Sequence, residues 1–112
     1  MMMTAIYSNG HLRLPYELSD AERILMKATQ TPKEVTLSMI PIRKTEYLNY
    51  GYKTVKTSPR ALRSCISFRL ALTELGMTIE EAVGEYETTQ VGKEFIFSIP
   101  RRRNGKGKKA RS

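Results

Sequence analysis

Apolar and polar positions near the N-terminus follow the pattern of a β-hairpin. Asn9-Gly10 is a residue pair that favours a two-residue type I′ turn, because both turn positions need positive φ angles. A hairpin over residues 4–14 with this turn pairs Tyr7 with Leu12 and places the apolar side chains of both strands on one face. We therefore predict two antiparallel strands joined by a tight turn.

The next part of the chain has the spacing of an amphipathic helix. Ser19 and Glu22 have the spacing of a capping box, and the apolar stripe after them predicts a helix over residues 20–29. Residues 34–42 then alternate between apolar and polar side chains and predict a strand, and a second strand is expected over residues 46–56. This middle part of the chain should thus add one helix and two strands.

Two further helices and a last strand complete the predicted domain. A serine followed by proline predicts a helix start and a helix over residues 59–75, and a second capping box predicts a shorter helix over residues 78–86. Alternating apolar residues predict a last strand over residues 91–99. The order β-β-α-β-β-α-α-β indicates one α+β globular domain over residues 1–100, with a small, mostly antiparallel sheet and two or three helices.

The charge is concentrated behind this domain. The chain has 19 basic and 11 acidic residues and a formal net charge of +8. Residues 101–112 contribute seven basic side chains and no acid, which leaves +1 for residues 1–100. This C-terminal tail has no apolar side chain larger than alanine. We expect it to be flexible and disordered by itself, because it cannot bury enough surface to offset the entropy of ordering.

A polycationic tail is typical of proteins that bind a polyanion. Its cations attract a phosphate backbone by displacing the counterions condensed on it. The residues expected to contact phosphates are therefore the basic residues of the tail: Arg101, Arg102, Arg103, Lys106, Lys108, Lys109 and Arg111. An acidic protein surface, a solubilising end and a localisation signal are the alternatives. Nothing amphipathic lies beside the tail to anchor it on anionic lipid.

A second candidate region interleaves basic and aromatic residues. Tyrosine rings on a strand can stack on unpaired bases while neighbouring cations hold the backbone. The candidates are Tyr50 and Tyr52 for stacking, and Lys53, Lys56, Arg60 and Arg63 for phosphate contacts. The alternative is that the tyrosines cover the core, since they are good strand formers. Gly51, between two tyrosines, indicates a bulge or a close approach of another backbone segment.

The chain offers little for catalysis. His11 is the only histidine and has no obvious partner nearby, and Cys65 falls on an apolar stripe where cysteine acts as a small buried hydrophobe. No group of residues has zinc-ligand spacing, and no glycine-rich loop is placed to hold a phosphate. We therefore expect no catalytic residues, no metal, no cofactor and no small-molecule substrate.

These features favour a non-enzymatic, nucleic-acid-binding accessory protein for DNA or RNA, of a size that suits a viral, plasmid or ribonucleoprotein role. The alternative is a protein-binding modulator or inhibitor that docks on an acidic surface of a larger machine, such as a polymerase or nuclease. A single cysteine, the absence of a membrane-spanning apolar run and the absence of a secretory pattern predict a reducing, intracellular location, in the cytoplasm, nucleoid or nucleus.

Overall fold

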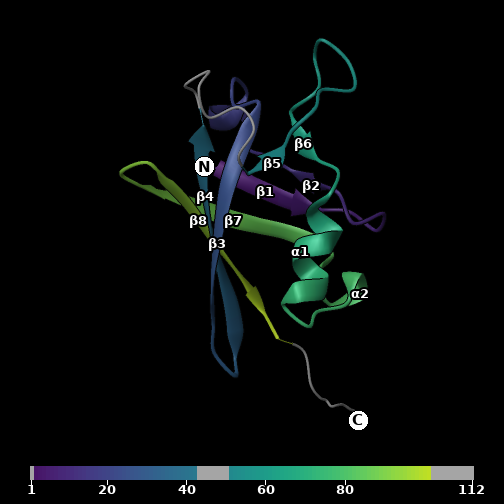
Figure 1. Ribbon diagram of the computed structural model, residues 1–112, viewed down its shortest axis with the longest axis vertical. Helices are drawn as coiled ribbons and strands as arrows, with labels where there is room; N and C mark the ends of the chain where they lie inside the picture. The colour runs from purple at the N-terminus through teal and green to yellow at the C-terminus, as the bar shows by residue number, and fades with distance from the viewer. Residues whose placement is uncertain (1, 43–50, 102–112) are drawn as a thin grey trace.

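Eight antiparallel strands form one sheet in a computed structural model that describes residues 2–42 and 51–101 (Figure 1). The sheet order is β5-β3-β4-β8-β7-β1-β2-β6. In chain order the elements are β1 (Met2–Ile6), β2 (Leu12–Arg13), the 3-10 turn η1 (Tyr16–Leu18), β3 (Arg23–Gln30), β4 (Glu34–Ile42), β5 (Tyr52–Lys53), β6 (Ser64–Cys65), α1 (Phe68–Glu74), α2 (Ile79–Ala82), β7 (Gly84–Val91) and β8 (Glu94–Pro100).

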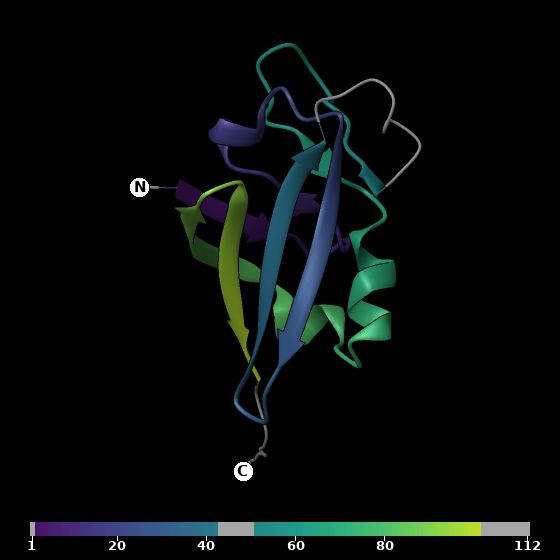
Figure 2. The ribbon, with the colours of Figure 1, turned by 60° about the vertical axis from the view of Figure 1, so that its left-hand side comes forward.

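The two end strands of this sheet meet, so that the sheet nearly closes into a barrel. Val55 lies two residues after the end of β5 and pairs with Ser64 of β6 through two backbone hydrogen bonds of 2.9 and 2.8 Å. On the other side, β7 joins the two halves of the sheet, because its first residues pair with β1 and its last residues pair with β8 (Figure 2). The predicted α+β class with two or three helices is therefore wrong: the domain is built mainly from an antiparallel sheet, and the two α-helices in its described residues are short.

The helix predicted over residues 20–29 is strand β3. It pairs with β4 along its whole length, from Arg23 opposite Ile42 to Gln30 opposite Val35. Burial follows this pairing and not a helical stripe, since Ile24 is fully buried while its neighbour Leu25 is 43% exposed. Eight consecutive cross-strand pairs with an apolar partner strand outweigh the local helix signal.

The first half of the helix predicted over residues 59–75 is also absent. Residues 64–65 form β6, which pairs with both β2 and Val55, and α1 begins only at Phe68. The C-terminal end agrees with the prediction, since α1 ends at Glu74, Leu75 is its C-cap, and Gly76 follows with φ of +72°. The strand pairing of β6 closes the sheet, and this long-range contact is invisible to a local helix signal.

The capping box at Thr78 is confirmed, but the helix behind it is only one turn long. The Thr78 hydroxyl accepts from the Glu81 backbone N–H, and the Glu81 carboxylate accepts from the Thr78 N–H. α2 ends at Ala82, and strand β7, which the sequence pattern missed, begins at Gly84.

Four predicted strand regions are confirmed in whole or in part. β4 matches the predicted strand over 34–42. β8 confirms the later part of the strand predicted over 91–99, whose first residue, Val91, ends β7 instead. The first hairpin is present, but Ile6 and not Tyr7 lies opposite Leu12, because the turn is longer and ends at Gly10 with φ of +85°. The strand predicted over 46–56 is represented by β5, and its residues before Gly51 lie outside the described part of the chain.

The interior of the barrel is filled from the sheet and from α1. Strands β4 and β8 contribute alternating buried side chains, and α1 adds Phe68 and Leu72, both at most 1% exposed. The rings of Tyr86 and Phe97 lie 5.7 Å apart between centroids, within the usual range for aromatic pairs. The core therefore holds the helix against the sheet through apolar burial.

A polar cluster lies on the outer face of the sheet, across β3, β4 and β8. The Ser38 hydroxyl donates a hydrogen bond to the carboxylate of Glu94, and the Lys27 ammonium lies 3.6 Å from the same carboxylate. The hydrogen bond from Ser38 and, second, the charge of Lys27 lower the pKa of Glu94. This cluster links three neighbouring strands by side-chain contacts.

Replacing Ser38 with alanine should reduce the pH dependence of stability in acid. The lowered pKa of Glu94 means that its carboxylate stabilises the fold above the unfolded-chain value of about 4.3, and that this contribution is lost as the pH falls through the folded value. Unfolding midpoints measured in urea between about pH 2 and pH 5 should therefore change less in Ser38→Ala than in the wild type. Ser98→Ala, which removes a hydroxyl paired with Thr36, should keep the wild-type slope. Equal slopes in all three proteins would contradict this role of Ser38.

Candidate nucleic-acid interface

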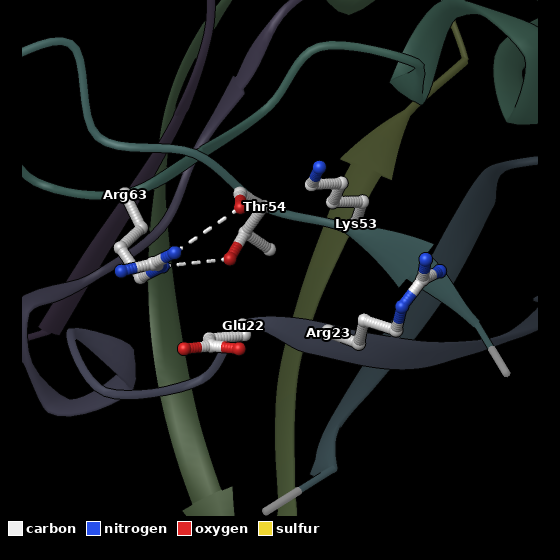
Figure 3. Close-up of a pocket in the computed structure, with 5 residues that line it drawn as sticks. All are labelled: Glu22, Arg23, Lys53, Thr54 and Arg63. Atoms are coloured by element: carbon white, nitrogen blue, oxygen red, sulfur yellow. Dashed lines mark hydrogen bonds between the residues drawn. The ribbon is translucent and has the colours of Figure 1, made fainter. Parts of the chain in front are cut away.

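A pocket lies where the two ends of the sheet meet. Its volume is about 250 Å³, and it is lined by Glu22, Arg23, Lys53, Thr54 and Arg63 (Figure 3). Thr54 and Arg63 each precede a residue of the Val55–Ser64 bridge, so barrel closure brings them together. Three basic residues and one acidic residue give the lining a surplus of positive charge.

Arg63 is held in place by Thr54. Its Nε donates to the Thr54 hydroxyl at 2.7 Å, and its Nη2 donates to the Thr54 carbonyl at 3.2 Å, as Figure 3 shows. The Thr54 hydroxyl in turn donates to the carbonyl of Ala21 at 2.5 Å. A guanidinium has five N–H donors, so these bonds position Arg63 on the pocket wall and leave further donors for a ligand.

Arg23 and Lys53 form a like-charged pair on the other side of Thr54 (Figure 3). They are directly opposite each other in the β3–β5 pairing, which places their Cβ atoms about 5 Å apart on one face. Nη1 of Arg23 donates to the carbonyl of Gly51 at 3.1 Å. Within residues 2–42 and 51–101 neither cation has an ion pair with an acidic side chain. Like charges opposite each other destabilise a sheet, and a bound anion would relieve this repulsion.

Lys56 and Arg60 extend the positive surface from the same end of the barrel. Both are exposed, and they lie in the loop of residues 56–63. This loop leaves and returns at the Val55–Ser64 bridge, next to the pocket. The four body cations named from the sequence therefore belong to one end of the barrel.

Tyr52 lies against the core instead of standing free on the surface. It is partly buried and packs against the core cluster. Burial, followed by the charges of Glu74 and Cys65, raises the pKa of its hydroxyl. The stacking role of Tyr52 stays a prediction, and that of Tyr50 falls on a residue outside the described part of the chain.

The start of the basic tail lies at the opposite end of β3 from the pocket. Arg101 donates from its backbone N–H to the carbonyl of Lys33 at 2.8 Å, and from its guanidinium to Thr31 and Gln30 at 3.2 and 2.5 Å. Gln30 ends β3 and Arg23 begins it, so about seven residues of strand, roughly 23 Å, separate the two basic sites. Figure 1 shows the end of β8 and strand β5 on opposite sides of the molecule. The remaining tail candidates, residues 102–111, lie outside the described residues.

The sequence pattern missed Arg23 as a site residue. A helix over residues 20–29 would have placed it away from Lys53, thirty positions later in the chain. Only the β3–β5 pairing makes them neighbours. A strand prediction for residues 23–30 would have been the signal to consider Arg23. It would then stand at the start of a strand that can pair with the basic strand containing Lys53.

His11 lies in the loop of the first hairpin, and Cys65 lies in the core. The His11 ring nitrogen Nδ1 lies 3.2 Å from the side-chain amide of Asn9 in the first hairpin loop. Cys65 is fully buried in β6, and burial raises the pKa of its thiol. Its burial agrees with the sequence prediction, although it lies on a strand and not on a helix.

Neither a search of the described residues for other kinds of site nor comparison with known proteins assigns a function. In the described part of the chain, no group of three or more His, Cys, Asp or Glu side chains is arranged to hold a metal ion. Among the same residues, no helix has the length and apolar character needed to cross a membrane. Comparison with protein-family models, curated proteins and solved structures gave no match, so function is inferred from the geometry of the site.

Proposed function

We propose that this protein is a non-enzymatic, nucleic-acid-binding accessory protein that binds phosphate groups at the pocket where the barrel closes. The like-charged pair of Arg23 and Lys53 is the main support, because like charges opposite each other destabilise a sheet and neither cation has an ion pair within the described residues. Arg63 adds a third positive charge whose position is fixed by Thr54. Phosphate oxygens suit this set, since guanidinium and ammonium groups donate strong charge-assisted hydrogen bonds to them.

A chain of phosphates explains the basic residues better than a single anion does. Lys56 and Arg60 lie in the exposed loop that starts and ends beside the pocket, so a backbone leaving the pocket would meet further cations. The tail begins about 23 Å away along β3, and it would contact a different part of a long polymer. In this proposal the pocket orients the nucleic acid, and the tail strengthens binding and speeds encounter.

Replacing Lys53 with alanine should weaken nucleic-acid binding about three- to tenfold and reduce the slope of log affinity against log salt by about one, because one phosphate contact is lost. The measurement is fluorescence anisotropy with labelled single- and double-stranded DNA and RNA over a salt series. Lys93→Ala, which removes an exposed lysine from the β7–β8 turn, is the matched control and should change affinity less than about twofold. Equal effects of the two substitutions would contradict the pocket as a phosphate site.

Two further experiments test the contribution of the tail and distinguish nucleic acid from the alternative partner, an acidic protein. A protein ending at Arg101 should bind more weakly and with less salt dependence, yet still respond to Lys53→Ala. Nuclease treatment of a pull-down separates nucleic acid from an acidic protein. Loss of all partners supports the proposal, and a retained protein partner supports a modulator that docks on a larger machine.

We further infer a reducing, intracellular location, since Cys65 is a buried single thiol.

A further inference from the structure

Among residues 2–42 and 51–101, no strand pairs with one edge of β3 over most of its length. In an antiparallel sheet, the N–H and C=O of successive residues face opposite neighbours in turn. Thr31 N donates to the carbonyl of Glu34 at 2.9 Å, which directs the odd-numbered residues of β3 towards β4. The even-numbered residues therefore face the other edge.

Strand β5 covers only the beginning of that other edge. Thr54 N donates to the carbonyl of Glu22, and Tyr52 lies opposite Ile24. Beyond this point the backbone groups of Met26, Ala28 and Gln30 face outward, and no strand among the described residues pairs with them. Residues 27–30 are all exposed. The described part of the chain therefore leaves this edge open to another strand.

This edge lacks the features that usually prevent pairing between proteins. Free edges are commonly protected by proline, by an outward lysine or by a bulge. The unpaired end of β8 has such protection. Pro100 lies at a position whose backbone N–H would face outward, and proline has no N–H to donate to another strand. On β3 the outward positions hold no proline, and the ammonium of Lys27 lies 3.6 Å from Glu94 on the sheet face.

We propose that the free edge of β3 pairs with β3 of a second copy of this chain, antiparallel and with the twofold axis at Ala28. In this register Ala28 lies opposite Ala28 of the second copy, and Met26 lies opposite Gln30. Three outward-facing residues on each copy then form about six backbone hydrogen bonds. The two barrels are joined into one continuous sheet.

The boundaries of the edge select a second copy and this register. Within the described residues, β5 occupies the edge up to Ile24. Pro32 has no backbone N–H, so the last outward donor is that of Gln30, and the free segment is symmetric about Ala28. A register centred on Lys27 would place two ammonium groups opposite each other and lose one pair of hydrogen-bonded residues. With Ala28 at the axis, each Lys27 lies opposite Thr29 of the second copy.

The test is the oligomeric state of the full chain, measured by sedimentation velocity from micromolar to millimolar concentration. A monomer–dimer equilibrium is expected, together with backbone amides of Met26, Ala28 and Gln30 whose hydrogen exchange slows as concentration rises. A monomer at every concentration would overturn the proposal. Slow exchange of these amides that does not depend on concentration would also overturn it, because the edge would then be covered within one chain.

Substitutions at the axis make the test specific. Ala28→Lys places two positive charges opposite each other and should weaken the dimer about tenfold, whereas Ala28→Val should leave the dimer within about threefold of the wild type. Ala28→Pro removes an outward N–H and should weaken it about a hundredfold, without removing a bond to β4. Thermal unfolding at low concentration identifies any variant that fails to fold. A dimer that persists unchanged in Ala28→Lys would contradict pairing through β3.

Discussion

Gly51→Ala should lower the free energy of unfolding by about 3 to 4 kcal/mol, a large share of the stability of a domain this size. Gly51 has φ of +77°, and a Cβ atom at this position would overlap the backbone carbonyl of Ile24, whose carbon would lie 2.9 Å away. The strain of a left-handed conformation accounts for about 1 to 2 kcal/mol. The remainder comes from moving β3 and β5 apart where their pairing begins.

Gly92→Ala separates strain from overlap. Gly92 has φ of +63°, and a Cβ atom there would meet nothing within 4 Å. This control should therefore cost only the conformational strain, about 1 to 2 kcal/mol. Urea or guanidinium unfolding followed by circular dichroism measures both. If Gly51→Ala is no more destabilising than Gly92→Ala, the close approach of Gly51 to Ile24 is not a feature of the folded protein.

Phe68→Ala should also destabilise the fold strongly, by about 3 to 5 kcal/mol. Phe68 is fully buried at the start of α1, where its ring joins side chains from the sheet in the core cluster. Truncation leaves a cavity that the barrel strands cannot easily fill, because their backbones are fixed by hydrogen bonds on both sides. The cost is the lost burial of the ring plus the cavity.

Leu70→Ala is the matched control on the same helix. Leu70 is 60% exposed, so its truncation should cost less than about 1 kcal/mol. Equilibrium unfolding of both variants tests whether α1 is held by its inner face. Similar effects of the two substitutions would mean that α1 does not pack against the barrel through Phe68.

In the proposed nucleic-acid binding, two groups of cations at opposite ends of β3 have different tasks: the pocket orients the nucleic acid, and the tail strengthens binding. Arg23 and Lys53 lie on paired strands at the end where the barrel closes, and Arg63, just before β6, is held by the buried hydroxyl of Thr54. Arg101, in contrast, is fixed by the turn between β3 and β4 at the other end of the same strand. A loss of affinity with an unchanged salt slope would identify variants that disturb the fold of the pocket instead of removing a phosphate contact.

Local patterns in the sequence were sufficient for some elements. Alternating apolar residues predicted β4 and β8, because both strands bury one face in the core and the alternation reports that directly. The capping box at Thr78 and the helix end at Gly76 are likewise set by neighbouring residues. The close backbone approach expected at Gly51 is present, since glycine between two strand-forming tyrosines has few other uses. The concentration of charge in residues 101–112 is a property of composition alone.

Only the tertiary structure decided the class of fold and the site. Residues 23–30 have apolar positions that fit a helix or a strand, and pairing with β4 selects the strand. Residues 64–65 become β6 because they close the sheet against Val55. The β3–β5 pairing places Lys53 beside Arg23, and the closure of the sheet places Thr54 beside Arg63. These contacts join residues that are far apart in the chain, and their free energy depends on shared strands and burial, which short-range spacing along one sequence does not encode.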